Sequence, residues 1–450
     1  MATNYIHRSQ CAPYDHRVTT PWGYSISSWE VPISAPNLDL NKEAPLAPVL
    51  DLLRPALPTD VPDFFSNDYL SITANPQLNR NVLGAFISSK KLLGSTGSRL
   101  LNGNSPSHAE TEKYLQSHFN ASAALMFTSG YDANVAFFGC VPQAEDIIVF
   151  DELVHASVRD GIAAARTSDA YSFFHNSVAS LESCISELLK KRPEILAGKS
   201  TVFVAVESLY SMDGDFSPLP QIIETLHCHI PKAYCHMVVD EAHTTGLYGS
   251  MGRGYVDHLG LQNEVNTVLH TFGKARGLTG AVILTSPIVR KYLVNYARPL
   301  IYTTSMPHLH LVAIKSTFDF IAGPEGDRLR KQVYECSQYF ATKLRLALKG
   351  IPESVLAMCA ADRSNDPLVS PVFPLLTSQS LKLAEYLNSK GYVAQAIPFP
   401  IVPKGQERIR VVIHAENTFS DIDAFIAILL DWVTSHWYLK NYGNRGCVRT

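Results

Sequence analysis

Between residues 61 and 310, short apolar runs alternate with segments that have the periodicity of amphipathic helices. Six runs have the length and composition of buried strands: 123–128, 147–150, 201–206, 237–240, 267–271 and 281–285. Their apolar character is continuous, which is typical of strands in a sheet covered on both faces. Residues 181–191 and 219–228 fit crossover helices between these strands. The alternation predicts an α/β domain with a mainly parallel central sheet.

The pattern changes on both sides of this region. Residues 1–60 are rich in Pro, Asn and Ser, and they predict an irregular arm that either wraps a partner subunit or forms a partly disordered tail. From residue 311, long helices at 329–348 and 418–437 surround short strands at 369–376, 392–396 and 408–414. We therefore expect a large domain over 61–310 and a smaller α+β domain over 311–450.

Composition excludes several classes of protein. The formal net charge of −3 argues against nucleic-acid binding, which needs a basic surface. The sequence has no run of about 18 apolar residues, so no membrane span is expected. The eight cysteines form no Cys-x-x-Cys pair and the N-terminus has no secretory pattern, so we expect reduced thiols, no metal site and a cytoplasmic location.

Polar residues follow two of the predicted strands where a ligand would bind, because open parallel sheets bind ligands beyond the carboxyl ends of their strands. Asp240 ends the run HMVVD, where it either caps the next helix or pairs with a cation such as a protonated pyridine nitrogen. Lys274 follows the run ending at Thr271. It is either a solvated surface lysine or a partly desolvated, nucleophilic amine.

Three further positions fit the same site, each with a structural alternative. The turn TSGYDAN, from Thr128, exposes N–H groups at a helix N-terminus, which either bind a phosphate or form an ordinary capped turn. His155 either stacks on a flat ring or is a structural histidine. Arg410 lies on a predicted strand and meets either a substrate carboxylate or a structural partner. The loop GSMGRG at 249–254 does not directly join a strand to a helix, so it is not a dinucleotide fingerprint.

Together these residues resemble the α-oxoamine synthase family of fold-type I pyridoxal-phosphate (PLP) enzymes, within the class-II PLP-dependent aminotransferase superfamily. The likeness covers about 67–307 and resumes at RIRVVIHAENT, and it is closest to the 8-amino-7-oxononanoate synthases. The matching motifs, in order, are NDYLS, GSTGSRLLNGNSPSHAETEKYL, TSGYDAN, DELVHAS, ESLYSMDGDFSPL, VVDEAHTTGLYGSMGRG, HTFGKARGLTGA and IYTTSMP.

The resemblance implies a role for each matching residue. Lys274 would carry PLP and later move the Cα proton of an amino acid, and Asp240 would pair with the pyridine nitrogen. His155 would stack on the ring and His243 would meet its phenolic oxygen. The other implied contacts are Ser211 near the cofactor, Gly130, Tyr131 and Thr271 at its phosphate, Thr303 and Thr304 at the phosphate of the neighbouring subunit, and Asn67 and Arg410 at the amino-acid substrate.

The implied reaction is a decarboxylative Claisen condensation of a small amino acid, expected to be alanine, with a CoA- or carrier-bound acyl thioester. The product is an α-amino ketone, and the expected assembly is a homodimer with shared active sites. Three alternatives stay open: a relative in specialised metabolism that uses a polyketide or fatty acyl thioester, an aminotransferase on the same fold, and a non-catalytic partner subunit. The presence of Lys274, Asp240 and His155 argues against the last.

The sequence departs from the family pattern at three places. Ser71 stands where members commonly have glycine after NDYL. The arginine that often precedes that motif has no clear match, since Arg54 aligns poorly, and the N-terminal arm is long. All three lie toward the acyl side, so they bear on whether pimeloyl-CoA is the substrate more than on the PLP chemistry.

Overall fold

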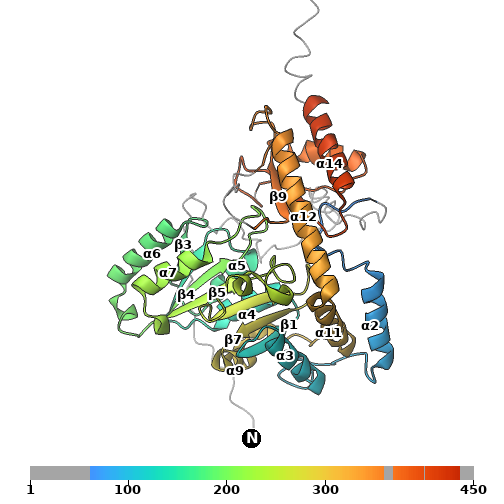
Figure 1. The fold of residues 1–450 in the computed structure, drawn as a ribbon. Coiled ribbons are helices and arrows are strands. Elements are labelled where there is room, and N and C mark those ends of the chain that lie inside the picture. Colours follow the sequence, from blue (N-terminus) through green and yellow to red (C-terminus); the bar gives the residue numbers. More distant parts are fainter. Residues whose placement is uncertain (1–60, 359–367, 400, 436–450) are drawn as a thin grey trace, which may run out of the picture. The chain divides into compact units, whose positions relative to one another are not determined.

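A computed structural model describes residues 61–358, 368–399 and 401–435, all within one compact unit (Figure 1). The predicted arm, Arg54 and the last residues of the predicted 418–437 helix lie outside the described residues. The division into domains at residue 310 stays a prediction.

The larger sheet has seven strands in the order β1-β7-β6-β5-β4-β2-β3. The strands from β6 to β3 run parallel to one another, whereas β7 is antiparallel to both of its neighbours. The prediction of a mainly parallel sheet is confirmed. The bounds are β1 Ala123–Phe127, β2 Ile147–Asp151, β3 Ala170–Phe173, β4 Val202–Glu207, β5 Cys235–Asp240, β6 Thr267–Thr271 and β7 Ala281–Thr285.

Helices cover both faces of this sheet, as the continuous apolar strands require. One face packs on α4 (Gly130–Cys140), α5 (Ala156–Ala163) and α9 (Pro287–Tyr296). The other face packs on α6 (Val178–Lys191) and α7 (Leu219–His229), and nearer β1 on α3 (Pro106–His118) and α11 (His308–Ala322). Residues of β2 alternate between the two cores, with Ile147 and Val149 on one side and Ile148 and Phe150 on the other.

A second, antiparallel sheet has the order β10-β11-β9-β8. Its strands are β8 Ala357–Met358, β9 Val372–Leu376, β10 Ala396–Ile397 and β11 Arg408–Val412, with α13 (Ser380–Ser389) and α14 (Phe419–Val433) beside them. The strand predicted at 392–396 is wrong in position, since only Ala396 of that segment pairs with β11. Small C-terminal strands and helices were expected, and they form this sheet and its cover.

The long helix α12 (Pro324–Ala347) joins the two cores (Figure 1). Its first half, including Leu329 and Val333, packs into the core of the large sheet, and its second half packs beside the small sheet. The helix begins earlier than the predicted residue 329. Proline at its first position and acidic residues in the first turn, Glu325 and Asp327, favour that start.

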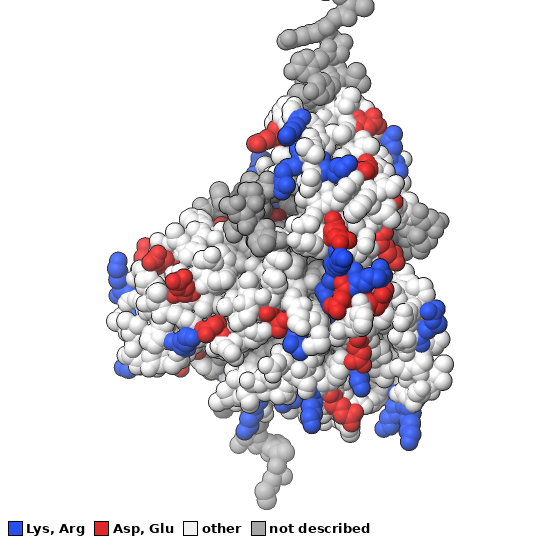
Figure 2. Space-filling view, in the orientation of Figure 1, with Lys and Arg blue, Asp and Glu red and all other residues white. Residues whose placement is uncertain are grey.

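Residues 61–72 run beside the small sheet and bring the NDYLS motif to it. The Val412 N–H donates to the Phe64 carbonyl at 2.8 Å, and the Ala415 N–H donates to the Tyr69 carbonyl at 2.9 Å. No described helix is both long enough and apolar enough to cross a bilayer. On the face seen in Figure 2, acidic and basic side chains are interspersed.

Ser71 adopts the left-handed backbone conformation, with φ of 51°, so a glycine would fit this turn without strain. Its Oγ accepts a hydrogen bond from the Glu416 N–H at 3.2 Å. Ser71→Gly should stay within about 0.5 kcal/mol of the parent, because relief of strain offsets the lost bond. Ser71→Ala keeps the strain and loses the bond, so it should lower the free energy of unfolding by about 1 kcal/mol. Equal denaturant unfolding of the two variants would contradict this account.

Candidate active site

The predicted site residues follow strands that end at one edge of the large sheet. Because β7 runs against its neighbours, β1 points in the same direction as the strands from β6 to β3. The turn after β1, the carboxylate that ends β5 and the segment after β6 therefore meet at the carboxyl edge, as expected for a ligand site in an open sheet.

Lys274 lies in direct contact with His243 at this edge. The Lys274 Nζ is 2.6 Å from His243 Nε2, and His243 Nδ1 is 2.6 Å from the Tyr69 hydroxyl. The Tyr69 hydroxyl is also 3.4 Å from Asn67 Oδ1. When Lys274 is charged it can only donate to Nε2, and Nδ1–H then donates to Tyr69. When it is neutral, its nitrogen can instead accept Nε2–H, and the Tyr69 hydroxyl then donates to Nδ1. The charge on Lys274 is thus coupled to the direction of the Tyr69 hydroxyl.

The ionisation of these groups is strongly perturbed. Burial lowers the pKa of Lys274 to about 8, although the negative charges of Asp240 and Glu207 oppose the shift. Burial, with the charges of Lys274 and Arg410, holds the pKa of His243 well below its usual range. Burial raises the pKa of Tyr69. His243 is therefore neutral at pH 7, and a useful fraction of Lys274 is the nucleophilic free amine.

The lowered pKa of Lys274 predicts how its reaction with an aldehyde depends on pH. Only the neutral amine reacts, so the rate at which cofactor-free protein captures pyridoxal at Lys274 should rise about tenfold per pH unit and level off above pH about 8. Stopped-flow absorbance measures this rate. An ordinary lysine would give a midpoint near its usual pKa of 10.5, which would contradict the buried environment.

Asp240 and His155 belong to one chain of hydrogen bonds. Asn134 Nδ2 donates to Asp240 Oδ2 at 2.7 Å and to Ser157 Oγ at 3.0 Å. Ser157 Oγ is 2.7 Å from His155 Nδ1, and the Ser157 N–H donates to the same nitrogen at 3.2 Å. His155 Nδ1 is therefore an acceptor, and the neutral ring carries its proton on Nε2. Asp240 is buried without a cationic protein partner among the described residues.

The backbone of His155 is fixed by a second carboxyl group. Glu207, the last residue of β4, accepts the His155 N–H at 2.6 Å. Burial and the neighbouring Asp240 raise the pKa of Glu207 well above its usual range. Burial lowers the pKa of His155, with Asp240 opposing the shift. The His155 residue itself is exposed, which leaves its ring accessible to a flat partner.

The turn after β1 presents the start of α4. The Ser129 side chain caps this helix by accepting the Asp132 N–H at 3.0 Å, and the N–H groups of Gly130 and Tyr131 lead the helix. A side chain at Gly130 would come within 3.3 Å of Thr271 at the end of β6, so the two implied phosphate positions are adjacent. The Tyr131 hydroxyl donates to Asp160 and is exposed. This arrangement suits an anion.

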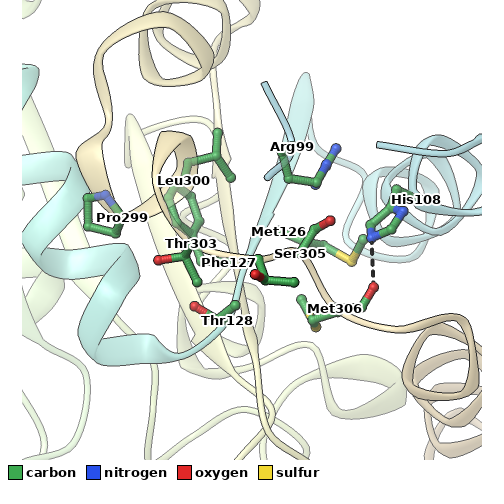
Figure 3. Close-up of a pocket in the computed structure, with 11 residues that line it drawn as sticks. Arg99, His108, Met126, Phe127, Thr128, Pro299, Leu300, Thr303, Ser305 and Met306 are labelled. Atoms are coloured by element: carbon green, nitrogen blue, oxygen red, sulfur yellow. Dashed lines mark hydrogen bonds between the residues drawn. The ribbon is translucent and has the colours of Figure 1, made fainter. Parts of the chain in front are cut away.

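Thr303 and Thr304 line a small pocket with Thr128 and Met126, at the end of β1 (Figure 3). Beside them, His108 bonds to the Met306 carbonyl at 3.1 Å. The contact of these two threonines with the phosphate bound in a neighbouring subunit stays a prediction. Ser211 lies on the turn between β4 and α7, and its role near the cofactor likewise stays a prediction.

Two buried arginines on β11 have different surroundings. Arg408 forms a structural ion pair with Asp213, whose Oδ1 lies 2.6 Å from Nη1, and it also donates to the Met212 carbonyl at 2.8 Å. Arg410 Nη2 donates only to Asn67 Oδ1, at 3.2 Å, while its buried Nε has no partner. Among the described residues no carboxylate lies within ion-pair distance of Arg410. A buried guanidinium in this state needs an anion.

The donor set fits PLP. It combines a desolvated primary amine for an aldehyde, a buried carboxylate without a cation for a pyridine nitrogen, an imidazole held in one tautomer beside an open face, and a helix N-terminus for a phosphate. Within the described residues, no group of three or more His, Cys, Asp or Glu side chains could hold a metal ion.

Sequence reasoning missed three residues of this site. Tyr69 belongs to the NDYLS motif, and Asn134 and Glu207 belong to longer motifs, but the sequence alone predicts no role for any of the three. Tyr69 lies in the segment that holds Asn67, Glu207 ends β4, and Asn134 lies on α4 shortly after Tyr131. The feature of the sequence that could have indicated them is a polar residue within an apolar, buried segment, because a buried polar group needs a hydrogen-bond partner.

Comparison with known proteins identifies relatives over most of the chain. The family model for aminotransferase class I and II matches residues 59–429. An 8-amino-7-oxononanoate synthase of Emericella nidulans is 36% identical over 84% of this chain and 90% of its own. The aminoacyl transferase sphA of Aspergillus fumigatus is 33% identical over 86% of this chain and 84% of its own. The structure of a Sphingomonas wittichii serine palmitoyltransferase superposes with a TM-score of 0.73 at 23% identity, over 89% of this chain and 99% of that one.

Proposed function

The chain belongs to the aminotransferase class I and II family and, within it, to the α-oxoamine synthases, and we propose that it condenses alanine with an acyl thioester to give an α-amino ketone. It is a PLP-dependent, acyltransferase-like enzyme, which sets aside the alternative of a non-catalytic subunit. What stays a proposal is the identity of both substrates and the role of each site residue.

One observation supports the condensation above all. A desolvated amine, Lys274, and a buried carboxylate, Asp240, lie at the carboxyl edge of the large sheet. Arg410, on β11 of the small sheet, is connected to this site through Asn67 and Tyr69, and its guanidinium has no carboxylate within ion-pair distance among the described residues. An amino acid carries both an amine and a carboxylate, so Arg410 would hold its carboxylate while its amine is activated. The site thus fits an amino-acid substrate.

When bound, PLP withdraws electrons from the Cα of an amino acid attached to it, which makes the Cα proton removable. Asp240 would keep the ring nitrogen protonated, and the Asn134–Ser157 chain would hold His155 against the ring. The neutral amine of Lys274 would remove the Cα proton. His243, whose ring is fixed by its Nδ1 contact with Tyr69, would orient Lys274 through Nε2 and meet the phenolic oxygen of the cofactor. A Cα–acyl carbon bond would form, the thiol would leave and CO2 would be lost.

The proposed function is tested with purified protein, added PLP, alanine and a panel of acyl thioesters. Thiol release, CO2 release and the product mass are measured together. We expect thiol release only when both substrates are present, and a product with the mass of the acyl thioester plus alanine, minus the free thiol and CO2. Conversion of the cofactor to pyridoxamine phosphate by alanine alone, without a condensation product, would establish an aminotransferase instead.

Two observations favour an acyl substrate other than pimeloyl-CoA: Ser71 stands where family members commonly have glycine, and the chain is similar to the aminoacyl transferase sphA. The panel therefore includes pimeloyl-CoA, long-chain acyl-CoA and carrier-bound acyl groups. Preference for pimeloyl-CoA supports a biotin-type reaction, and preference for the longer or carrier-bound groups supports specialised metabolism.

Arg410→Met should raise KM for the amino acid about 10- to 150-fold, because charge-assisted hydrogen bonds contribute about 1.5–3 kcal/mol. KM for the thioester should change much less. Arg408→Met is the matched control on the same strand: it breaks the ion pair with Asp213 and should lower stability rather than amino-acid affinity. Equal effects of the two variants on amino-acid KM would contradict the role of Arg410.

A homodimer with shared sites is also proposed, and an apolar exposed segment supports it. Ile87 is 77% exposed and Leu93 is 81% exposed, and the same stretch of sequence holds the exposed Leu83, Leu92, Leu100 and Leu101. Exposed apolar residues gathered in this way mark interaction sites. Mixing Lys274→Ala with Thr304→Val subunits should restore part of the activity lost in each, because one hybrid site would then be intact. A monomer by light scattering, or no restoration on mixing, would overturn the shared site.

A further inference from the structure

Arg276 is a buried cation that the proposed reaction does not use. It follows Lys274 by two positions, is 1% exposed, and its guanidinium carbon lies 3.4 Å from the centroid of the Phe318 ring. Its one hydrogen bond is from Nη2 to the Gly252 carbonyl at 3.3 Å. Its Nε and Nη1 are buried and have no partner among the described residues.

Other unpartnered donors lie within electrostatic reach of Arg276. His118 Nε2 and Arg253 Nε are buried and also lack a partner in the described chain. Burial, together with the positive charges of Arg276, Arg253 and Arg330, lowers the pKa of His118 to about 3. Arg330 donates to the Gly246 carbonyl, beside the Gly252 carbonyl that Arg276 contacts. Three guanidinium groups therefore surround the turn at 246–254.

The nearby carboxylates are engaged elsewhere. Asp327 pairs with Arg330, and Asp257 lies 3.9 Å from Arg253 and binds the Ser250 N–H. Glu241 accepts the N–H groups of Tyr255 and Val256, and Asp319 accepts the Tyr114 hydroxyl. No described carboxylate lies within ion-pair distance of Arg276. Stacking on Phe318 provides partial compensation. An uncompensated buried charge is strongly unfavourable, so a counter-ion is required.

We propose that a small monovalent anion, chloride under ordinary salt conditions, binds beside Arg276 and accepts the free N–H groups of Arg276, Arg253 and His118. Aromatic side chains enclose the cluster: Phe318 lies against Arg276, and Phe119 and Tyr114 surround His118. This enclosure favours a halide over a phosphate or a carboxylate-bearing metabolite. Bound there, the anion stabilises the segment that carries Lys274 and the turn at 246–254.

The direct test is a crystal of the PLP-loaded full-length enzyme in sodium bromide. We expect an anomalous peak within hydrogen-bonding distance of Arg276 Nη1 that disappears in Arg276→Leu. A water molecule at this position, or a peak only at exposed surface sites, overturns the proposal.

A solution test compares the melting temperature in sodium chloride or bromide with that in sodium gluconate of equal ionic strength. Halide should raise Tm saturably, on the order of 2 °C, whereas gluconate is too large to enter. Arg276→Leu should lose this difference. Arg328→Leu, at an exposed arginine of α12, should retain it. Equal Tm of the parent in halide and gluconate overturns the proposal, even if Arg276→Leu fails to fold.

Discussion

Replacing Lys274 with alanine should abolish both the covalent attachment of PLP and the condensation. The parent protein should be yellow, and borohydride should fix the cofactor to Lys274; Lys274→Ala should hold at most dissociable cofactor. Loss of a general base alone costs about 10²–10⁴-fold in rate. Because Lys274 also supplies the amine, we expect kcat/KM to fall at least about 10⁴-fold.

Lys291→Ala is the matched control, since Lys291 is an exposed lysine on α9. It should leave the visible spectrum and kcat/KM unchanged. Methylamine should partly restore proton transfer in Lys274→Ala if the missing group is an amine base. Peptide mapping that finds the reduced cofactor on another lysine, together with parental activity in Lys274→Ala, would reject the assignment.

Replacing Asp240 with asparagine should have the second largest effect. Asparagine keeps the approximate shape but removes the negative charge that would hold a proton on the ring nitrogen, and its contact with Asn134 would pair two neutral amides. Losing one group that stabilises developing charge costs about 10²–10³-fold in kcat, and we expect a loss of this order. The pKa of the bound cofactor, read from its absorbance against pH, should shift as well.

Glu241→Gln is the neighbouring control. Burial raises the pKa of Glu241 to about 8, and its carboxyl group accepts backbone N–H groups of Tyr255 and Val256 rather than facing Lys274. This variant should lower Tm while the cofactor absorbance against pH stays parental. If Asp240→Asn kept the parental titration, Asp240 would not contact the ring nitrogen.

The reactive residues at strand ends could be predicted from the sequence. Their positions depend only on the apolar runs that precede them and on one general rule of sheet topology. Asp240 and Lys274 follow apolar runs, and the carboxyl ends of parallel strands share an edge. The surface-lysine alternative for Lys274 is disfavoured by its contact with His243. The structural alternative for Arg410 is disfavoured too, since the ion pair belongs to Arg408.

What could not be predicted depends on contacts between distant segments. Tyr69 reaches His243 across the fold, and Asn134 on α4 reaches Asp240 at the end of β5. In neither pair does the separation of the two residues along the sequence indicate that they are in contact. The edge strand β3 was missed because its sequence AYSF is only partly buried and lacks a continuous apolar run. The roles of Ser211, Thr303 and Thr304 and the cytoplasmic location stay predictions.

The pairing of β1 with β7 has a consequence for the order in which the enzyme matures. Ala123 pairs with Thr285, so the turn that would bind a phosphate is anchored to a strand made much later. During synthesis at about 5–20 residues per second, β1 waits roughly 8–30 seconds for its neighbour. Until then its edge is open to other chains. Cofactor capture should therefore follow, rather than accompany, translation of the large sheet, and ribosome-bound chains ending before β7 should bind no PLP.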